Sequence, residues 1–143
     1  IVHIFIYNND GQILLQKRAA TLSYCPNHWA TAACGHVTSG EDYLAAGNRE
    51  LHEEIGINIP LTFVAAPIYA TTDRMYFKKR LGVLTGIYEG LFKTSESEVS
   101  EVRWFSPGEI DTLVEKNELM HPEFSFLWKN FRTPIFKNRC LET

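Results

Sequence analysis

The stretch spanning residues 40–55 constrains the fold more than any other part of this 143-residue chain. At about 100° per residue, Leu44, Leu51 and Ile55 fall within roughly 40° of one another, which predicts an amphipathic helix. Gly56 follows at the position where a glycine commonly ends a helix. A helix with one apolar stripe must bury that stripe against another element, so we expect it to cover one face of a sheet.

Extended segments on both sides of this helix supply such a sheet. Residues 2–7 and 12–16 have extended apolar patterns, and the turn sequence Asn8-Asn9-Asp10-Gly11 between them predicts a β-hairpin. Residues 29–33 are small and apolar, as expected for a short buried strand. Further strands are expected at residues 61–71, 80–92 and 98–105.

Two more helices are indicated after the last strand. Ser106, Pro107 and Glu109 form an N-terminal capping sequence for a helix that runs to about Asn117. Pro122 begins a final helix with four residues spaced to bury one face, namely Phe124, Leu127, Trp128 and Phe131. The pattern therefore predicts a single α/β domain over residues 1–143, with a mixed β-sheet sandwiched between helices.

Composition excludes several classes of partner. The formal net charge of −3 argues against broad electrostatic binding to a nucleic acid polymer or an anionic membrane. No apolar run approaches the ~18 residues that a transmembrane helix needs, so we expect no membrane association. Cys25, Cys34 and Cys140 lack the spacing of a disulfide framework and fit a reducing compartment, so the expected location is the cytoplasm.

Four charged residues crowd one side of the predicted helix. Glu50, Glu53 and Glu54 occupy positions i, i+3 and i+4, the spacing that brings side chains together. Clustered carboxylates repel one another, and they are the hard oxygen ligands that suit Mg²⁺ or Mn²⁺. Arg49 can pair with one carboxylate and hold its rotamer. For these residues alone, a solvated acidic helix face is the alternative interpretation.

A longer pattern surrounds the acidic cluster. In order it reads Gly35, five residues, Glu41, seven residues, Arg49-Glu50-Leu51, one residue, Glu53-Glu54, one residue, Gly56-Ile57. This pattern resembles the signature of the Nudix hydrolase family at every specified position, and the order of strands and helices resembles the Nudix fold. The resemblance implies hydrolysis of a diphosphate linkage in a nucleoside diphosphate joined to another moiety, with Mg²⁺ or Mn²⁺ as the cofactor.

The resemblance also implies roles for individual residues. Arg49 would orient a carboxylate, and Glu41 would stabilise the loop and helix. The metal ligands would be Glu50, Glu53 and Glu54, together with the backbone carbonyl of Gly35. The general base that accepts a proton from the attacking water would be Glu50, or Glu98 or Glu101 from a later segment. For the last two residues, surface charges on a strand edge are the alternative interpretation.

The stretch "HWATAACGHVTSGE" resembles isopentenyl diphosphate isomerases, which share this fold and carry a catalytic cysteine. Cys34 occupies the cysteine position and is followed by Gly35 and His36. His3 and His28 are the available counterparts of the histidines that bind the metal in those isomerases. An isomerase is therefore the second hypothesis for the function.

Two departures argue against the isomerase. Isomerases lack the intact Arg-Glu-Leu-x-Glu-Glu segment, and they carry a Glu-x-Glu pair on the strand where this chain has Lys79-Arg80-Leu81. A buried small residue is the simpler interpretation of Cys34.

The expected substrate is a small-molecule diphosphate. Candidate contacts for its phosphates are Arg18, His36, Lys79 and Arg80, with ordinary surface or loop residues as the alternative. A third hypothesis is a Nudix module that binds a nucleotide without turnover, although the intact signature weighs against it. The resemblance leaves a homodimer open.

Overall fold

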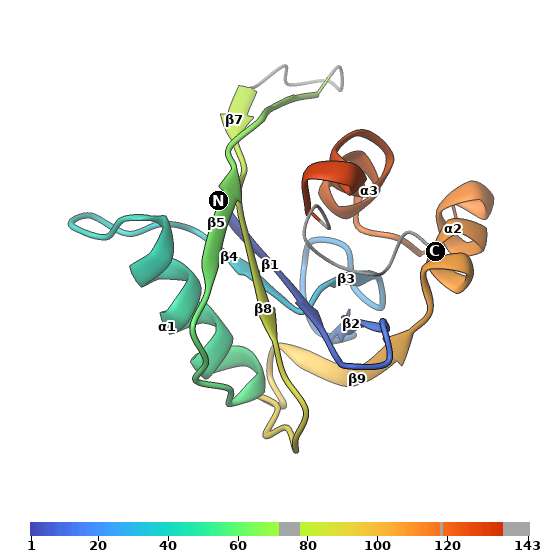
Figure 1. Ribbon diagram of the computed structural model, residues 1–143, viewed down its shortest axis with the longest axis horizontal. Helices are drawn as coiled ribbons and strands as arrows, with labels where there is room; N and C mark the ends of the chain where they lie inside the picture. The colour runs from blue at the N-terminus through green and yellow to red at the C-terminus, as the bar shows by residue number, and fades with distance from the viewer. Residues whose placement is uncertain (72–77, 118, 136–143) are drawn as a thin grey trace.

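The computed structural model describes residues 1–71, 78–117 and 119–135 (Figure 1). Cys140 lies outside the described residues. In order, the elements are β1 (Val2–Tyr7), β2 (Ile13–Arg18), β3 (Trp29–Thr31), β4 (Ala33–Gly35), α1 (Tyr43–Ile55), β5 (Thr62–Ala65), β6 (Ile68–Ala70), β7 (Lys78–Arg80), β8 (Gly82–Ile87), β9 (Val99–Phe105), α2 (Pro107–Lys116) and α3 (Pro122–Ile135).

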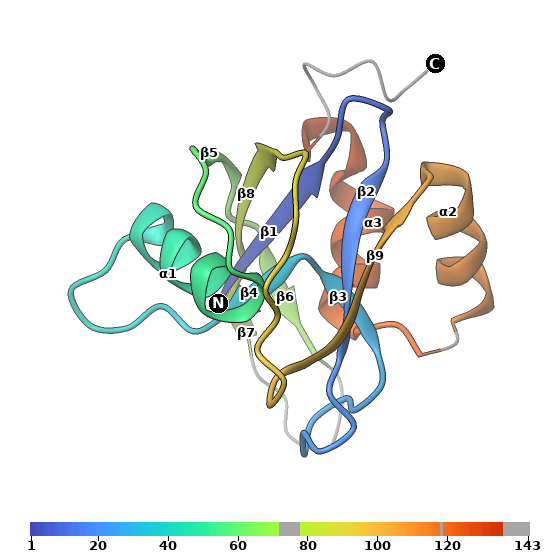
Figure 2. The same cartoon turned by 90° about the horizontal axis from the view of Figure 1, so that it is seen from below.

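A seven-stranded sheet forms the centre of the molecule. Its strands run in the order β3-β2-β1-β8-β5, with β4 also paired to β1 and β9 also paired to β2. The β1–β8 pair is parallel and the other pairs of this sheet are antiparallel, so the sheet is mixed. Helix α1 lies on one face, and α2 and α3 lie on the other (Figures 1 and 2). The predicted arrangement of a mixed sheet between helices is confirmed.

The two strands of the N-terminal hairpin separate along their length. Next to the turn, Ile6 pairs with Leu14 and Tyr7 pairs with Ile13. Further from the turn, β1 pairs with β4 while β2 pairs with β3. The single strand expected at residues 29–33 is therefore two short strands, which occupy the opening between β1 and β2.

Alternate residues of β1 belong to two separate cores. Phe5 stacks on Phe124 of α3, with ring centroids 5.9 Å apart, in the core beneath α2 and α3. Ile4 and Ile6 pack with Leu51 in the core beneath α1. Because successive side chains of a strand point to opposite faces, the buried strand β1 packs against helices on both faces of the sheet.

Helix α1 begins three residues later than predicted. The carboxylate of Asp42 accepts a hydrogen bond from the backbone N–H of Ala45 at 2.8 Å and caps the first turn. Gly56 ends the helix with a left-handed φ of 71°, as the sequence predicted. Glu41 therefore precedes the helix instead of lying on one of its faces.

The buried face of α1 also differs from the prediction at one end. Leu51 and Ile55 are buried as expected, but Leu44 is 40% exposed, so its assignment to the core was wrong. Ala46 and Gly47 lie against the sheet instead. The side of α1 that contacts the sheet includes small residues, because these allow the closest approach of helix to sheet. A prediction based on large apolar residues alone therefore misplaces the buried side of the helix.

The later segments follow the prediction with shorter strands. Residues 61–71 are divided at Pro67, which has no N–H to donate to a ladder, and the strand expected at 80–92 ends at Ile87. In α2, Ser106 and Glu109 form the reciprocal capping box, with bonds of 3.1 and 2.9 Å. In α3, the expected apolar face is buried at Phe124, Leu127 and Trp128, whereas Phe131 is half-buried.

We expect Gly47→Ala to destabilise the protein although alanine favours helices. A Cβ at Gly47 would lie 2.2 Å from Cδ1 of the fully buried Leu84. Helix propensity favours alanine by about 1 kcal/mol, but overpacking costs about 1–3 kcal/mol. Asn48→Ala, at an exposed position of the same helix, is the control and should be neutral or slightly stabilising. Urea denaturation measures both, and an unchanged or higher stability for Gly47→Ala would contradict this reasoning.

Candidate active site

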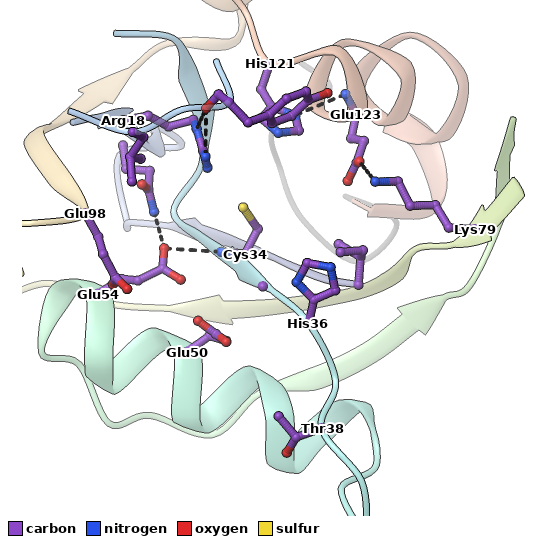
Figure 3. Close-up of a pocket in the computed structure, with 15 residues that line it drawn as sticks. Arg18, Cys34, His36, Thr38, Glu50, Glu54, Lys79, Glu98, His121 and Glu123 are labelled. Atoms are coloured by element: carbon purple, nitrogen blue, oxygen red, sulfur yellow. Dashed lines mark hydrogen bonds and ion pairs between the residues drawn. The ribbon is translucent and has the colours of Figure 1, made fainter. Parts of the chain in front are cut away.

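A cavity of about 390 Å³ opens among residues of β2, β4 and α1 (Figure 3). We call one side of it the acidic wall, which consists of Glu50, Glu54 and Glu98. Cys34 lies between this wall and the other side (Figure 3). We call that other side the opposite wall, which consists of Tyr24, Lys79, His121 and Glu123.

Glu54 is buried, although the sequence places it on the polar side of the helix. The side-chain amide of Gln16 donates to Oε1 of Glu54 at 2.6 Å, and the backbone N–H of Cys34 reaches the same oxygen at 3.5 Å. The amide of Gln16 also donates to the carbonyl of Ala32 at 3.0 Å. One carboxylate thus connects α1 to β2 and β4, the strands on either side of the opening.

The pKa of Glu54 is raised well above its ordinary value. Burial is the largest cause, and a hydrogen bond with the neighbouring carboxyl of Glu50 adds to it, whereas the bond from Gln16 acts in the opposite direction. The charge of Glu98 raises the pKa further. The surroundings therefore disfavour a negative charge on Glu54 unless a cation is present.

Arg49 joins the loop before α1 to the acidic wall. Its Nε and Nη2 donate to the two oxygens of Glu41 at 2.8 and 3.0 Å, and its Nη1 donates to Glu50 at 2.8 Å. Nη1 also contacts Glu53 at 3.3 Å, and Nη2 donates to the carbonyl of His36 at 3.0 Å. Hydrogen bonding from Arg49 is the main reason that the pKa of Glu41 is lowered to about 2. Arg49 thus fixes the orientation of Glu50.

Gly35 leaves room for the carboxylate of Glu50. A Cβ at Gly35 would lie 2.3 Å from both Cδ and Oε1 of Glu50, and 2.6 Å from Oε2. No side chain other than hydrogen fits there while Glu50 keeps its position. The contact explains why a glycine at the end of β4 accompanies the glutamate of α1.

The donor types of this wall fit a hard divalent cation. The carboxylates of Glu50, Glu54 and Glu98, and the nearby carbonyl of Gly35, are all oxygen donors. Among the described residues, no three His, Cys, Asp or Glu side chains are grouped in a way that could already hold a metal ion. A cation bound here would exchange some of the hydrogen bonds that Arg49 and Gln16 make for metal–oxygen contacts.

Cys34 and His36 lie at the cavity as the sequence suggested. Burial is the largest cause that raises the pKa of the Cys34 thiol, and the charge of Glu54 raises it further. The thiol is therefore neutral near pH 7 and does not supply a reactive thiolate. His36 is exposed.

Several residues singled out from the sequence do not line the cavity, among them Glu53, Glu101 and Arg80. The Glu53 side chain is 51% exposed and contacts Arg49 instead of lining the cavity. Glu101 pairs with Arg103 at 2.8 Å on β9. Arg80 lines a neighbouring hollow of the surface.

Arg18 and Lys79 line the cavity, and both have protein partners. The guanidinium of Arg18 donates to the carbonyl of Tyr24 at 3.0 and 3.3 Å, and Lys79 forms an ion pair with Glu123. Burial alone would raise the pKa of Glu123, but hydrogen bonds from His3 and Lys79 lower it to about 2. The ammonium of Lys79 is therefore largely neutralised within the wall.

Several residues that line the cavity have no signal in the family signature, among them Gln16, Tyr24, His121 and Glu123. Gln16 carries a recognisable signal, because it is a polar residue next to the apolar run Ile13-Leu14-Leu15. His121 and Glu123 reach the cavity from the start of α3, far along the chain from Cys34. No local pattern connects residues that meet only through the tertiary fold.

Comparison with known protein families identifies the class of protein. The NUDIX domain model matches residues 1–125, so the chain belongs to the Nudix family. The chain is similar to the MutT protein from Methanosarcina mazei Go1, whose crystal structure aligns over 92% of this chain and 90% of that one, with a TM-score of 0.74 and 22% identity. This likeness supports the fold.

Sequence relatives carry two kinds of name. The chain is 32% identical, over 75% of its length, to an isopentenyl-diphosphate Delta-isomerase of Nocardia farcinica. It is also 32% identical, over 76% of its length, to the uncharacterized Nudix hydrolase YfcD of Escherichia coli. The matches span 63% and 59% of those two proteins. The resemblance to both Nudix hydrolases and the isomerase branch is confirmed.

Within the part of the chain that the structure describes, no helix has both the length and the apolar character needed to cross a membrane.

We expect Glu54→Gln to stabilise the metal-free protein at about pH 8. Because the pKa of Glu54 is higher in the folded state than its ordinary 4.5, the folded state binds this proton more tightly than the unfolded state. The stability contributed by Glu54 therefore falls as the pH rises above about 4.5. Glutamine keeps an oxygen for Gln16 without a charge, and should raise the free energy of unfolding by about 1–3 kcal/mol.

Thermal denaturation in the presence of EDTA, from about pH 4 to pH 8, measures this difference. The gain should disappear near pH 4, where the carboxyl is protonated in both states. Glu53→Gln, at an exposed position of the same helix, is the control and should show little change. A Glu54→Gln variant that is less stable than the wild type at pH 8 would contradict the burial argument.

Proposed function

We propose that this protein is a metal-dependent Nudix hydrolase that cleaves a diphosphate linkage in a small organic diphosphate, with a nucleoside diphosphate derivative as the favoured class. The observation that supports it most is the pair formed by the buried Glu54 and by Glu50, which lies against Gly35 at the cavity. Carboxylates that are costly to ionise and that face a cavity suit a Mg²⁺ ion and the phosphates it accompanies.

Different residues would bind the metal ion, orient its ligands and contact the phosphates. Glu50, Glu54 and the carbonyl of Gly35 would hold the ion, and Arg49 keeps Glu50 oriented. Mg²⁺, or Mn²⁺ in its place, would supply neutralisation of the diphosphate and a water of lowered pKa. Arg18 and His36, which line the cavity, would contact phosphate oxygens.

Glu98 is the general base that we favour. It is exposed at the cavity on the same wall as Glu54, so its carboxylate can accept the proton of an attacking water. Glu101 is paired with Arg103, which makes it the weaker candidate. Glu50 is the other candidate, although Arg49 already occupies one of its oxygens.

Isomerisation of isopentenyl diphosphate is the second candidate, because Cys34 lines the cavity and several relatives carry that name. The contacts of His3 argue against it. The ring is fully buried, its Nδ1 bonds to Thr31 at 2.9 Å and its Nε2 bonds to Glu123 at 2.8 Å. A histidine with both nitrogens engaged is not free to bind a metal. The Nδ1 of His28 likewise contacts the backbone, at the Pro26 carbonyl.

A panel of nucleoside and isoprenoid diphosphates, assayed with Mg²⁺, separates the candidates. We expect hydrolysis of a nucleoside diphosphate derivative, and a loss of kcat/KM of about 100-fold or more in Glu54→Gln, since even outer-shell partners of a metal contribute about 10- to 100-fold. Cys34→Ala should retain hydrolysis. Isomerisation that disappears in Cys34→Ala would favour the second candidate, and saturable binding without turnover would favour a nucleotide-binding module.

Gly35→Ala should lower kcat/KM by about 10- to 100-fold without unfolding the protein. The new methyl group would displace the Glu50 carboxylate. Gly35 does not have a positive φ, so its backbone tolerates alanine. Gly108→Ala is the matched control, because a Cβ there lies 4.0 Å from its nearest neighbour and Gly108 does not line the cavity. Activity assays and thermal denaturation of both variants check this, and an active Gly35→Ala enzyme would argue against Glu50 as a ligand.

A further inference from the structure

His121 lies across the cavity from Glu50 and Glu54 (Figure 3). The residue directly precedes α3 and is only 4% exposed. Its backbone N–H donates to the carbonyl of Trp29 at 2.8 Å, and its own carbonyl accepts from the N–H of Ser125 at 3.1 Å. Bonds to β3 on one side and to α3 on the other therefore fix the position from which the imidazole faces the cavity.

The hydrogen bonds of the imidazole define which nitrogen carries the proton. Nδ1 accepts from the backbone N–H of Glu123 at 3.2 Å, so the proton of the neutral ring is on Nε2. Burial, and then the charge of His3, lower the pKa of His121 to about 3, with Arg18 and Lys79 adding to this and Glu123 opposing it. Among the described residues, Nε2 has no hydrogen-bond partner.

Tyr24 provides the apolar surface beside this donor. Its ring meets the ring of His121 edge to face, with centroids 5.5 Å apart at an angle of 77°. Tyr24 is 54% exposed and lines the same cavity. A group that extends from the acidic wall into this part of the cavity meets the ring of Tyr24 and the Nε2–H donor of His121.

We propose that His121 donates a hydrogen bond from Nε2 to an acceptor atom on the nucleoside of the substrate, with Tyr24 packing against that nucleoside. The inference rests on the proposed function, because the acidic wall sets which end of the cavity holds the diphosphate. A hydrocarbon tail placed here would remove Nε2–H from water without offering an acceptor, which is unfavourable. An oxygen or nitrogen atom of the sugar or the base would accept a hydrogen bond from Nε2–H. His121 is therefore a specificity-determining residue that favours a nucleoside over an isoprenoid.

Two substitutions separate this contact from the structural role of His121. The side-chain oxygen of asparagine can replace Nδ1 as the acceptor for Glu123, but asparagine has no donor at the position of Nε2. The side-chain amide of glutamine can reach the position of Nε2 but does not reproduce Nδ1. His121→Asn therefore tests the donor while keeping the contact to α3, and His121→Gln tests whether a donor alone is sufficient.

The measurement is calorimetric titration, with Mg²⁺, of two probes that resist hydrolysis. One is α,β-methylene-ADP, and the other is methylenediphosphonate, which has the same bridged phosphorus groups and no nucleoside. We expect His121→Asn to weaken the nucleotide about five- to tenfold and to change methylenediphosphonate by less than about twofold. His121→Gln should bind the nucleotide within about threefold of the wild type, despite a lower Tm. His52→Asn, at an exposed position of α1, is the control and should match the wild type.

The outcomes also distinguish this inference from the proposed function. Equal weakening of both probes by His121→Asn, or no weakening of the nucleotide, would overturn the contact to the nucleoside. A wild-type protein that binds the nucleotide no more tightly than methylenediphosphonate would overturn it as well, while leaving hydrolysis intact. If methylenediphosphonate binds without Mg²⁺, or equally well to Glu54→Gln, the proposed metal-dependent site itself fails.

Discussion

The burial of the Glu54 carboxylate is the interaction on which the arrangement of the acidic wall depends. Gln16 reaches it from β2 and the N–H of Cys34 reaches it from β4, at the opening left where the hairpin strands separate. This docking sets the rotation of α1 about its axis. With Glu54 directed into the sheet, Glu50, one turn earlier on the same side, must lie against the end of β4, where only a glycine leaves space for it.

The same arrangement costs stability that the remaining contacts partly offset. Glu54 resists ionisation because it is buried beside other carboxylates. Arg49 compensates at the solvent side of the wall by binding Glu41, Glu50 and Glu53. Arg49, which neutralises part of this charge, thus lies outside the lining of the cavity, behind the carboxylates. Such a separation is expected where a charged ligand is to bind, since sites are commonly kept at the expense of stability.

Features of the fold that depend on residues close together in the chain are predictable from the sequence. The amphipathic helix, its glycine end, the capping box of α2 and the spacing of the glutamates all depend on residues within a few positions of one another. The errors have a common physical origin. The angular position of Leu44 places it with Leu51 and Ile55 on the predicted apolar stripe, whereas Ala46 and Gly47 make the close contact with the sheet. Gln16, His121 and Glu123 were missed because their role depends on which strands and helices meet.

The relatives of this chain include both isopentenyl-diphosphate isomerases and Nudix hydrolases, and the residues near the opposite wall bear on which reaction fits this chain. Cys34 and His36 keep positions that resemble the isomerases, but a single cysteine and histidine do not define a reaction. His3 is engaged by Thr31 and Glu123, and Glu123 in turn binds Lys79, so this side of the cavity is a closed network of ion pairs and hydrogen bonds. A network whose charges already satisfy one another has little affinity for a metal ion. The neutral imidazole of His121 also faces the cavity, and it is a donor suited to recognition of a substrate and not to its chemistry. In the function we propose, the acidic wall would hold the metal and the opposite wall would recognise the substrate, so chemistry and recognition would lie on separate sides of one cavity.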